Sequence, residues 1–165
     1  MDAVFEVPGA PWVGVSPALA SVRRITVAVV SAVLAVMVVG VWLVLRDLLG
    51  WPVLLSALLV LAAAAALAWV AVARNAASWA WAEREADLFV RHGIWVRRLE
   101  VVPYGRMQLV EVTAGPLQRR AGIATVTLRT AAPGSDARIL GVPAAEASRL
   151  RDRLTARGEA QAAGL

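Results

Sequence analysis

The sequence predicts an α+β membrane protein: a two-helix transmembrane hairpin followed by a small antiparallel β-sheet or half-barrel, capped by a C-terminal amphipathic helix. Three observations predict this class. Two long uncharged apolar runs fill the first half of the chain, short β-prone runs separated by turn residues follow, and an apolar helical stripe ends the chain. The apolar share, 59% of 165 residues, exceeds the roughly 45–50% of soluble domains and excludes a disordered or fibrous protein.

The N-terminal half is expected to hold a flexible tail over residues 1–22, because Pro and Gly recur there without a helical period. The hairpin region follows over 23–81, with spans at about 25–45 and 51–73. The first span is uncharged over 21 residues, which as a helix reach roughly 30 Å, the thickness of a bilayer's hydrocarbon core. The five-residue link 46–50 is too short for a domain, so the two helices are antiparallel.

Apolar runs of this kind also occur in signal peptides and in the core helices of soluble proteins. A secretory signal peptide has an apolar stretch of about 7–15 residues near the N-terminus. Here the stretch begins at Ile25, is longer, and has a second stretch behind it. A buried core helix of a soluble protein is disfavoured by two consecutive uncharged segments of this length.

The arginines predict the orientation in the cell membrane. Arg23, Arg24 and Arg74 flank the open end of the hairpin, whereas the tight turn has only Arg46. By the positive-inside rule, both termini are cytoplasmic. From Arg74 onward there are 14 Arg (17 minus 3) and 9 acidic residues (12 minus 3), so this part carries the whole net charge of +5.

The cytoplasmic part is expected to fold as one domain over 82–158, with a disordered tail over 159–165. Residues 75–85 are expected to continue the second helix. Strands are predicted at 87–91, 94–102, 107–113, 122–130 and 137–142. The fourth strand alternates, which predicts one buried and one wet face. A helix from Pro143 to about Arg157 carries Ala147, Leu150 and Leu154 on one stripe.

Three motifs in this part carry a family resemblance. They are Arg91–Ile94 (RHGI), like R-x-G-I/L; Val102–Val110 (VPYGRMQLV), like I-P-x-x-R-I-Q-x-V; and Gly115–Val126 (GPLQRRAGIATV), close to G-P-L-Q-R-x-x-G-I-A-T-V. The chain resembles the bacterial pleckstrin-homology-like (PH-like) domain of YdbS-like membrane proteins over about 70 residues. Met107 and Gly105 depart from the pattern. The resemblance implies a PH-like barrel or half-barrel capped by a helix, a fold that hosts lipid, peptide and self-association sites alike.

The chain lacks the residue patterns of an enzyme. Without Cys and with the single histidine His92, expected as a solvated turn residue, neither a metal site nor a Cys–His pair can form. Glu83, Glu85 and Asp87 are expected to be a solvated charge run. Phosphate-binding glycine loops are absent from the sequence. We therefore expect a non-catalytic protein without metal or cofactor.

The remaining candidates are contact residues on the domain surface. They are Arg97, Arg98, Arg106, Gln118, Arg119 and Arg120. The preferred hypothesis is a membrane-anchored interaction or scaffold module at the inner leaflet that docks a protein partner or a second copy. The alternative is an anionic-lipid headgroup-binding module, with about 1 kcal/mol for each arginine near the surface. A basic cytoplasmic face is also expected from the positive-inside bias alone, without any bound ligand. Nucleic-acid binding is disfavoured because acids are interleaved with the arginines.

Overall fold

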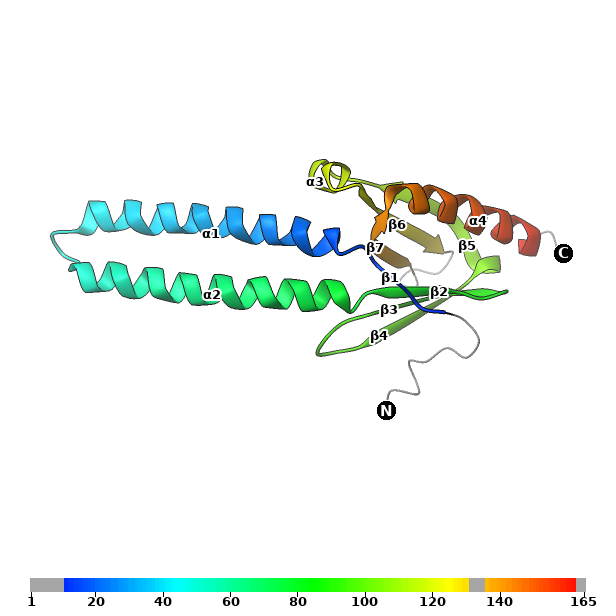
Figure 1. Cartoon of the computed structure of the whole chain (residues 1–165), viewed down its shortest axis with the longest axis horizontal. Coiled ribbons are helices and arrows are strands. Elements are labelled where there is room, and N and C mark those ends of the chain that lie inside the picture. Colours follow the sequence, from blue (N-terminus) through cyan, green and yellow to red (C-terminus); the bar gives the residue numbers. More distant parts are fainter. Residues whose placement is uncertain (1–10, 131–135, 163–165) are drawn as a thin grey trace. The chain divides into compact units, whose positions relative to one another are not determined.

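The computed structural model of the protein describes residues 11–130 and 136–162 (Figure 1). The chain forms two compact units. One is helical and comprises Ala20–Arg74; the other, here called the β-rich domain, combines the segment up to Leu19 with the chain from Asn75 onward. The helical unit is thus an insertion within the sequence of the β-rich domain.

The helical unit consists of most of α1 (Ala18–Leu45) and α2 (Trp51–Ala77). Both helices are long and apolar enough to cross a membrane, and in the most apolar window of each no residue is buried. A core helix of a soluble protein would be mostly buried, so this exposure argues for a lipid environment. The tight turn is closed by the carbonyl of Leu45, which accepts from the amides of Leu48 and Leu49. The predicted hairpin of apolar helices is confirmed.

The expected N-terminal tail is wrong for residues 11–22, and residues 1–10 lie outside the described residues. Val13–Gly14 form β1, which pairs antiparallel with β2 (Ala80–Glu83), and α1 already begins at Ala18. The guanidinium of Arg91 lies 4.3 Å from the ring centroid of Trp12. A two-residue strand is too short to show a period, and its pairing partner is more than 60 residues away, so the local pattern carries no sign of it.

The expected continuation of the second helix through residue 85 is also wrong. The helix ends at Ala77, where the Ser78 hydroxyl donates to the carbonyl of Asn75 at 2.7 Å, and β2 follows. Ala and Glu favour helices, but Trp81 and Ala82 are buried here against the domain core. Tertiary packing therefore overrides local propensity.

The strands of the β-rich domain form two antiparallel sheets. The first has the order β1-β2-β3-β4, with β3 at Asp87–His92 and β4 at Arg98–Pro103. The second has the order β5-β6-β7, with β5 at Met107–Thr113, β6 at Ile123–Thr130 and β7 at Ala137–Pro143. A short 3-10 helix, η2 (Tyr104–Arg106), joins them. The β3–β4 connection spans five residues, Gly93–Arg97, where the sequence suggested a two-residue turn.

The core lies between the two sheets and the C-terminal helix α4 (Ala144–Ala162). The predicted stripe Ala147, Leu150 and Leu154 is fully buried, and the helix continues five residues beyond its expected end. The expectation of a wet face on the fourth strand is wrong. Thr125 and Thr127 of β6 are only 8% exposed, because β6 is the central strand and both of its faces are covered.

Candidate functional site

The chain path defines two ends of the β-rich domain. At the helix-joined end, β1 leads into α1 and α2 returns into β2. There the Ser16 amide donates to the carbonyl of Gly141 at 2.9 Å, and Leu19 is buried against that glycine. At the opposite end lie the β2–β3 connection, η2 and the C-terminal part of α4, where the Gly105 amide donates to Gln161 Oε1 at 2.9 Å.

The β3–β4 loop lies at the helix-joined end. Arg91 is paired with Ala80, the first residue of β2, so the chain beyond Arg91 extends past the start of β2 (Figure 1). The Gly93 amide donates to the Ser78 hydroxyl at 3.0 Å, and that hydroxyl donates to the last turn of α2. The base of the loop is therefore bonded to the residue that directly follows the second apolar helix.

His92 holds the base of this loop, and its expected role as a solvated turn residue is wrong. It is the last residue of β3, and its side chain is only 18% exposed. Its ring stacks on Trp79 with centroids 4.2 Å apart, and its Nε2 lies 3.2 Å from Glu100 Oε1. Both partners come from other strands or connections, which a local pattern does not indicate.

The loop also exposes apolar residues that the sequence analysis did not single out. Trp95 is 97% exposed and Val96 is 69% exposed, and Arg97 and Arg98 follow directly, both exposed. The sequence predicts a strand for these residues, because Ile, Trp and Val favour β-structure. The adjacent Gly93 and Arg-Arg pair were the available signal for a loop.

The second basic loop connects β5 to β6 and contains α3 (Pro116–Arg120). It also lies at the helix-joined end, because Ile123, which follows the loop, pairs with Pro143 just beyond Gly141. Arg119 and Arg120 are exposed in the last turn of α3. The sequence suggested an irregular loop here, since Gly-Pro is typical of turns, but Pro also suits the first turn of a helix.

Gln118, the remaining candidate of this loop, supports the loop conformation. Its Oε1 accepts from the Gly115 amide at 3.0 Å, and its Nε2 donates to Thr125 Oγ1 at 3.1 Å. Because both the oxygen and the nitrogen of this side-chain amide are bonded within the domain, Gln118 fixes the shape of the loop that carries Arg119 and Arg120. A contact between Gln118 and a partner stays a prediction.

Five of the six candidate residues therefore share one end of the domain, and Arg106, exposed in η2, lies at the other. The arginines at the helix-joined end belong to loops of different sheets, so they form two basic loops and not one pocket (Figure 1). Neither the segment 93–98 nor 114–122 contains an acidic residue. Within the part of the chain that the structure describes, Arg98, Arg119 and Arg120 make no ion pair.

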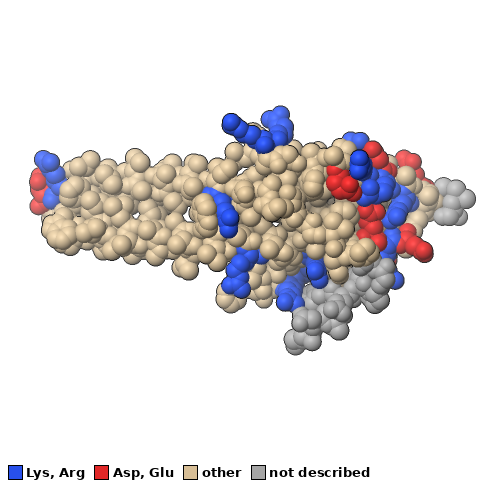
Figure 2. Space-filling view, in the orientation of Figure 1, with Lys and Arg blue, Asp and Glu red and all other residues tan. Residues whose placement is uncertain are grey.

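At the opposite end, arginines are bound by carboxylates. Glu83, expected to be solvated, is mostly buried and lies 2.8 Å from Arg153 Nη2 and 3.4 Å from Arg157 Nη1. Arg153 also contacts Glu146, and Arg157 donates to the Tyr104 hydroxyl at 3.0 Å. Figure 2 shows acidic and basic side chains of the domain gathered together over α4.

These contacts shift two pKa values. The hydrogen bonds to Glu83 and Glu146 raise the pKa of Arg153 above its ordinary value. Burial raises the pKa of the Tyr104 hydroxyl, while the hydrogen bond from Arg157 acts in the opposite direction. Arg153 and Arg157 are thus satisfied by carboxylates and a hydroxyl of their own domain.

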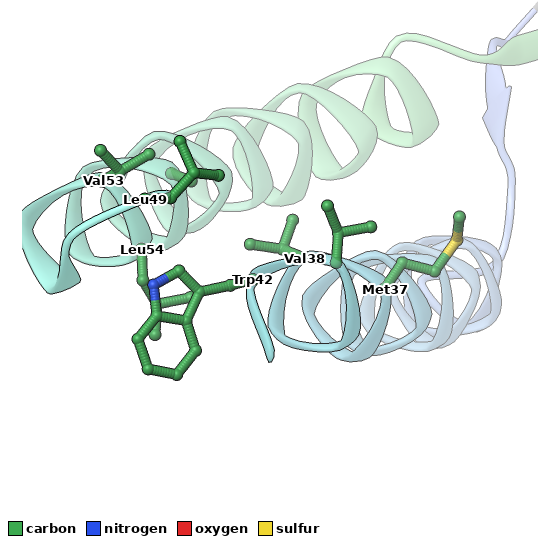
Figure 3. A pocket seen from close by; sticks show the side chains of 8 residues that line it. Met37, Val38, Trp42, Leu49, Val53 and Leu54 are labelled. Atoms are coloured by element: carbon green, nitrogen blue, oxygen red, sulfur yellow. The ribbon is translucent and has the colours of Figure 1, made fainter. Parts of the chain in front are cut away.

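Cavities with catalytic chemistry are not found among the described residues, and no cluster of three metal-ligating side chains occurs in 11–130 and 136–162. The hairpin carries an apolar groove of about 290 Å³ near its turn, lined by Trp42 and Leu54 from opposite helices (Figure 3). A second groove of about 440 Å³ lies nearer Arg23. Both are lined mostly by aliphatic side chains, which suits contact with acyl chains or with another helix.

The bacterial PH domain family matches residues 12–158, a range that begins just before β1 and ends within α4. The chain belongs to this family. It is also similar to the UPF0699 transmembrane protein YdbS of Bacillus subtilis (strain 168), with 30% identity over 148 residues, 86% of this chain and 89% of the relative. No solved structure matches the chain. The protein is therefore a bacterial PH domain protein that passes through a membrane twice, and the family match includes the strand that precedes the hairpin.

Proposed function

We propose that this bacterial PH domain protein is a non-catalytic module anchored in the cell membrane, with both termini in the cytoplasm. Its helix-joined end rests on the inner leaflet, where the two basic loops bind anionic lipid headgroups. One observation carries the proposal. Arg119 and Arg120 of this end stand in a loop without acids and make no ion pair among the described residues. Arg153 and Arg157 of the opposite end are bound by carboxylates.

The distances favour contact with headgroups. The uncharged part of α2 ends at Arg74, three residues before the end of the helix, which is about 4.5 Å of helical rise. The headgroup layer on each side of a bilayer is about 5–7 Å thick. Ser78 therefore lies at the level of the headgroups or at their border. Arginines close to that level are within the Debye length of about 8 Å over which anionic lipids attract them.

Docking of a protein partner or a second copy is the second candidate function. It is supported by β4, which is the edge strand of its sheet and exposes Val101. An edge strand offers unpaired backbone groups to which another strand can add. Leu109 and Leu117 are also exposed, but singly, and scattered apolar residues are ordinary on protein surfaces. The basic loops therefore give the stronger argument, and they favour lipid.

The test compares lipid preference in two double variants of the full-length protein. Arg119→Ala/Arg120→Ala removes two charges from the helix-joined end. Arg106→Ala/Arg138→Ala removes two charges from exposed positions at the opposite end and is the matched control. Each protein is placed in bilayers of phosphatidylcholine and phosphatidylglycerol. Electron paramagnetic resonance then measures how much spin-labelled phosphatidylglycerol the protein immobilises relative to spin-labelled phosphatidylcholine.

We expect the wild type and the control to prefer phosphatidylglycerol, with a preference that declines as salt is added. The Arg119/Arg120 variant should lose about tenfold or more of this preference, because each arginine contributes about 1 kcal/mol and about 1.4 kcal/mol corresponds to a factor of ten. Equal preferences in all three proteins would refute headgroup binding by α3. If the same variant instead lost a crosslinked protein neighbour in cell membranes, docking would become the favoured function.

A further inference from the structure

We infer that the tip of the β3–β4 loop, Ile94-Trp95-Val96, inserts into the interfacial layer of the same leaflet and acts as an apolar wedge. The occupant of this surface is the phospholipid interface itself, where acyl chains meet headgroups. The inference rests on the proposed function in one respect, since both require the helix-joined end to face the membrane. It adds a charge-independent contact at a site other than the arginines.

The position of the loop supports insertion. The pairing of Arg91 with Ala80 places Gly93 beside Ser78, and the hydrogen bond from the Gly93 amide to the Ser78 hydroxyl agrees with this register. Everything beyond Gly93 extends past the point at which the chain leaves α2 and enters β2. The loop tip therefore lies at the end of the domain where the chain enters α1 and leaves α2, which is the end tethered to the membrane.

The composition of the tip fits an interface. Trp95, at 97% exposed, and Val96 are the two most exposed large apolar side chains of the described β-rich domain. Such a pair at a loop tip is unfavourable in water, whereas tryptophan is enriched where hydrocarbon meets headgroups. Arg97, the last residue of the loop, and Arg98, the first residue of β4, follow the tip directly, where anionic headgroups would lie beside an inserted ring.

The backbone holds the tip in a defined shape. Gly93 has φ +106°, and a Cβ at this position would overlap the carbonyl oxygen of Val96, so the loop folds back tightly on its first residue. At the base of the loop, the ring of His92 stacks on the ring of Trp79. A loop fixed at its base presents its apolar tip without first having to become ordered, which lowers the entropic cost of binding.

The experiment uses the absence of cysteine in the chain. Val96→Cys gives a single spin-label site at the tip, and Ala160→Cys gives a matched exposed site near the end of α4. In full-length protein in bilayers, collisions of the label with oxygen, which partitions into lipid, are compared with collisions with a water-soluble nickel complex. The label at 96 should collide more with oxygen, and the label at 160 more with nickel.

Trp95→Ala in the Val96→Cys background should shift the label at 96 towards nickel, and Trp95→Phe should shift it less. A label at 96 that behaves like the label at 160 overturns the wedge. So does a label that is immobilised and protected from both reagents, because a protein then covers the tip.

Repeating the measurement in pure phosphatidylcholine separates the two proposals. Insertion that persists there supports the wedge even if the arginine variants show no lipid preference. An aqueous label at 96 together with a preserved lipid preference refutes the wedge alone.

Discussion

The two ends of the β-rich domain use the same residue type in different ways. At the opposite end, Arg153 and Arg157 are held by Glu83, Glu146 and Tyr104. At the helix-joined end, Arg119 and Arg120 occupy a loop without acids. The net charge of +5 does not reveal this difference. What an arginine does depends on whether a carboxylate of its own domain already satisfies it.

The largest expected effect concerns the side of the membrane on which both ends lie. A reporter enzyme that works only in the cytoplasm should be active when fused after Leu165 and inactive when inserted in the link 46–50. The measurement is reporter activity in intact cells, normalised to the amount of fusion protein. Activity only from the link would mean that both termini lie outside the cytoplasm, so the β-rich domain would not face the inner leaflet.

The next effect contrasts two aromatic residues. Tyr104→Ala removes a fully buried ring at the opposite end and should lower the free energy of unfolding by about 3–5 kcal/mol. Trp95→Ala removes a larger ring at the helix-joined end and should change it by less than about 0.5 kcal/mol. Urea unfolding of the full-length protein in detergent micelles, followed by near-ultraviolet circular dichroism, measures both. A large loss in Trp95→Ala would mean that the loop is part of the core.

A smaller effect tests the ion pairs. Glu83→Gln leaves Arg153 and Arg157 without their shared carboxylate and should cost about 1–3 kcal/mol. Glu111→Gln is the control. Glu111 Oε2 lies 3.6 Å from Arg129 Nη2, and both side chains are exposed. An ion pair of this kind contributes about 0–1 kcal/mol to stability. The same unfolding measurement applies. Equal costs would show that the network contributes no more than an ordinary surface pair.

The smallest effect is a loss of stability at alkaline pH. The pKa of Tyr104 is raised in the folded protein, so above pH 10, near the ordinary tyrosine value, the unfolded state loses its proton first. Stability is therefore fully present below about pH 10 and declines as the pH rises through the folded pKa. Arg157, Glu83 and Asp87 are the charged groups near this hydroxyl. Tyr104→Phe should make the loss of stability above pH 10 less steep. If the loss is unchanged in this variant, ionisation of another group causes it.

The sequence alone predicted the features that depend on local pattern. The apolar helices were predictable because lipid requires each spanning segment to be apolar and to satisfy its own backbone groups. The stripe of α4 follows similarly from its helical period, and the strand Met107–Thr113 follows from its place between two turns. By contrast, β1 and β2 depend on pairing between residues separated by the whole hairpin, so their existence is a property of the folded domain.

The candidate site was predictable in composition but not in arrangement. The Arg-Arg pairs at 97–98 and 119–120 are visible in the sequence. That both pairs lie at the same end of the domain is not visible there, because it follows from the register of β2 with β3 and of β6 with β7. Trp95 was missed for a related reason. Its β-forming neighbours suggested a strand, and only the close approach at Gly93 reveals a loop.

Fluorescence quenching measures how near each end of the β-rich domain lies to the headgroups. A fluorophore is attached to Leu117→Cys, in α3 beside the basic pair, or to Ala160→Cys, in α4. Each protein is placed in bilayers that contain a lipid with a nitroxide on its headgroup. We predict strong quenching at 117 and little at 160. Equal quenching at the two sites, or stronger quenching at 160, would contradict a domain whose helix-joined end rests on the membrane.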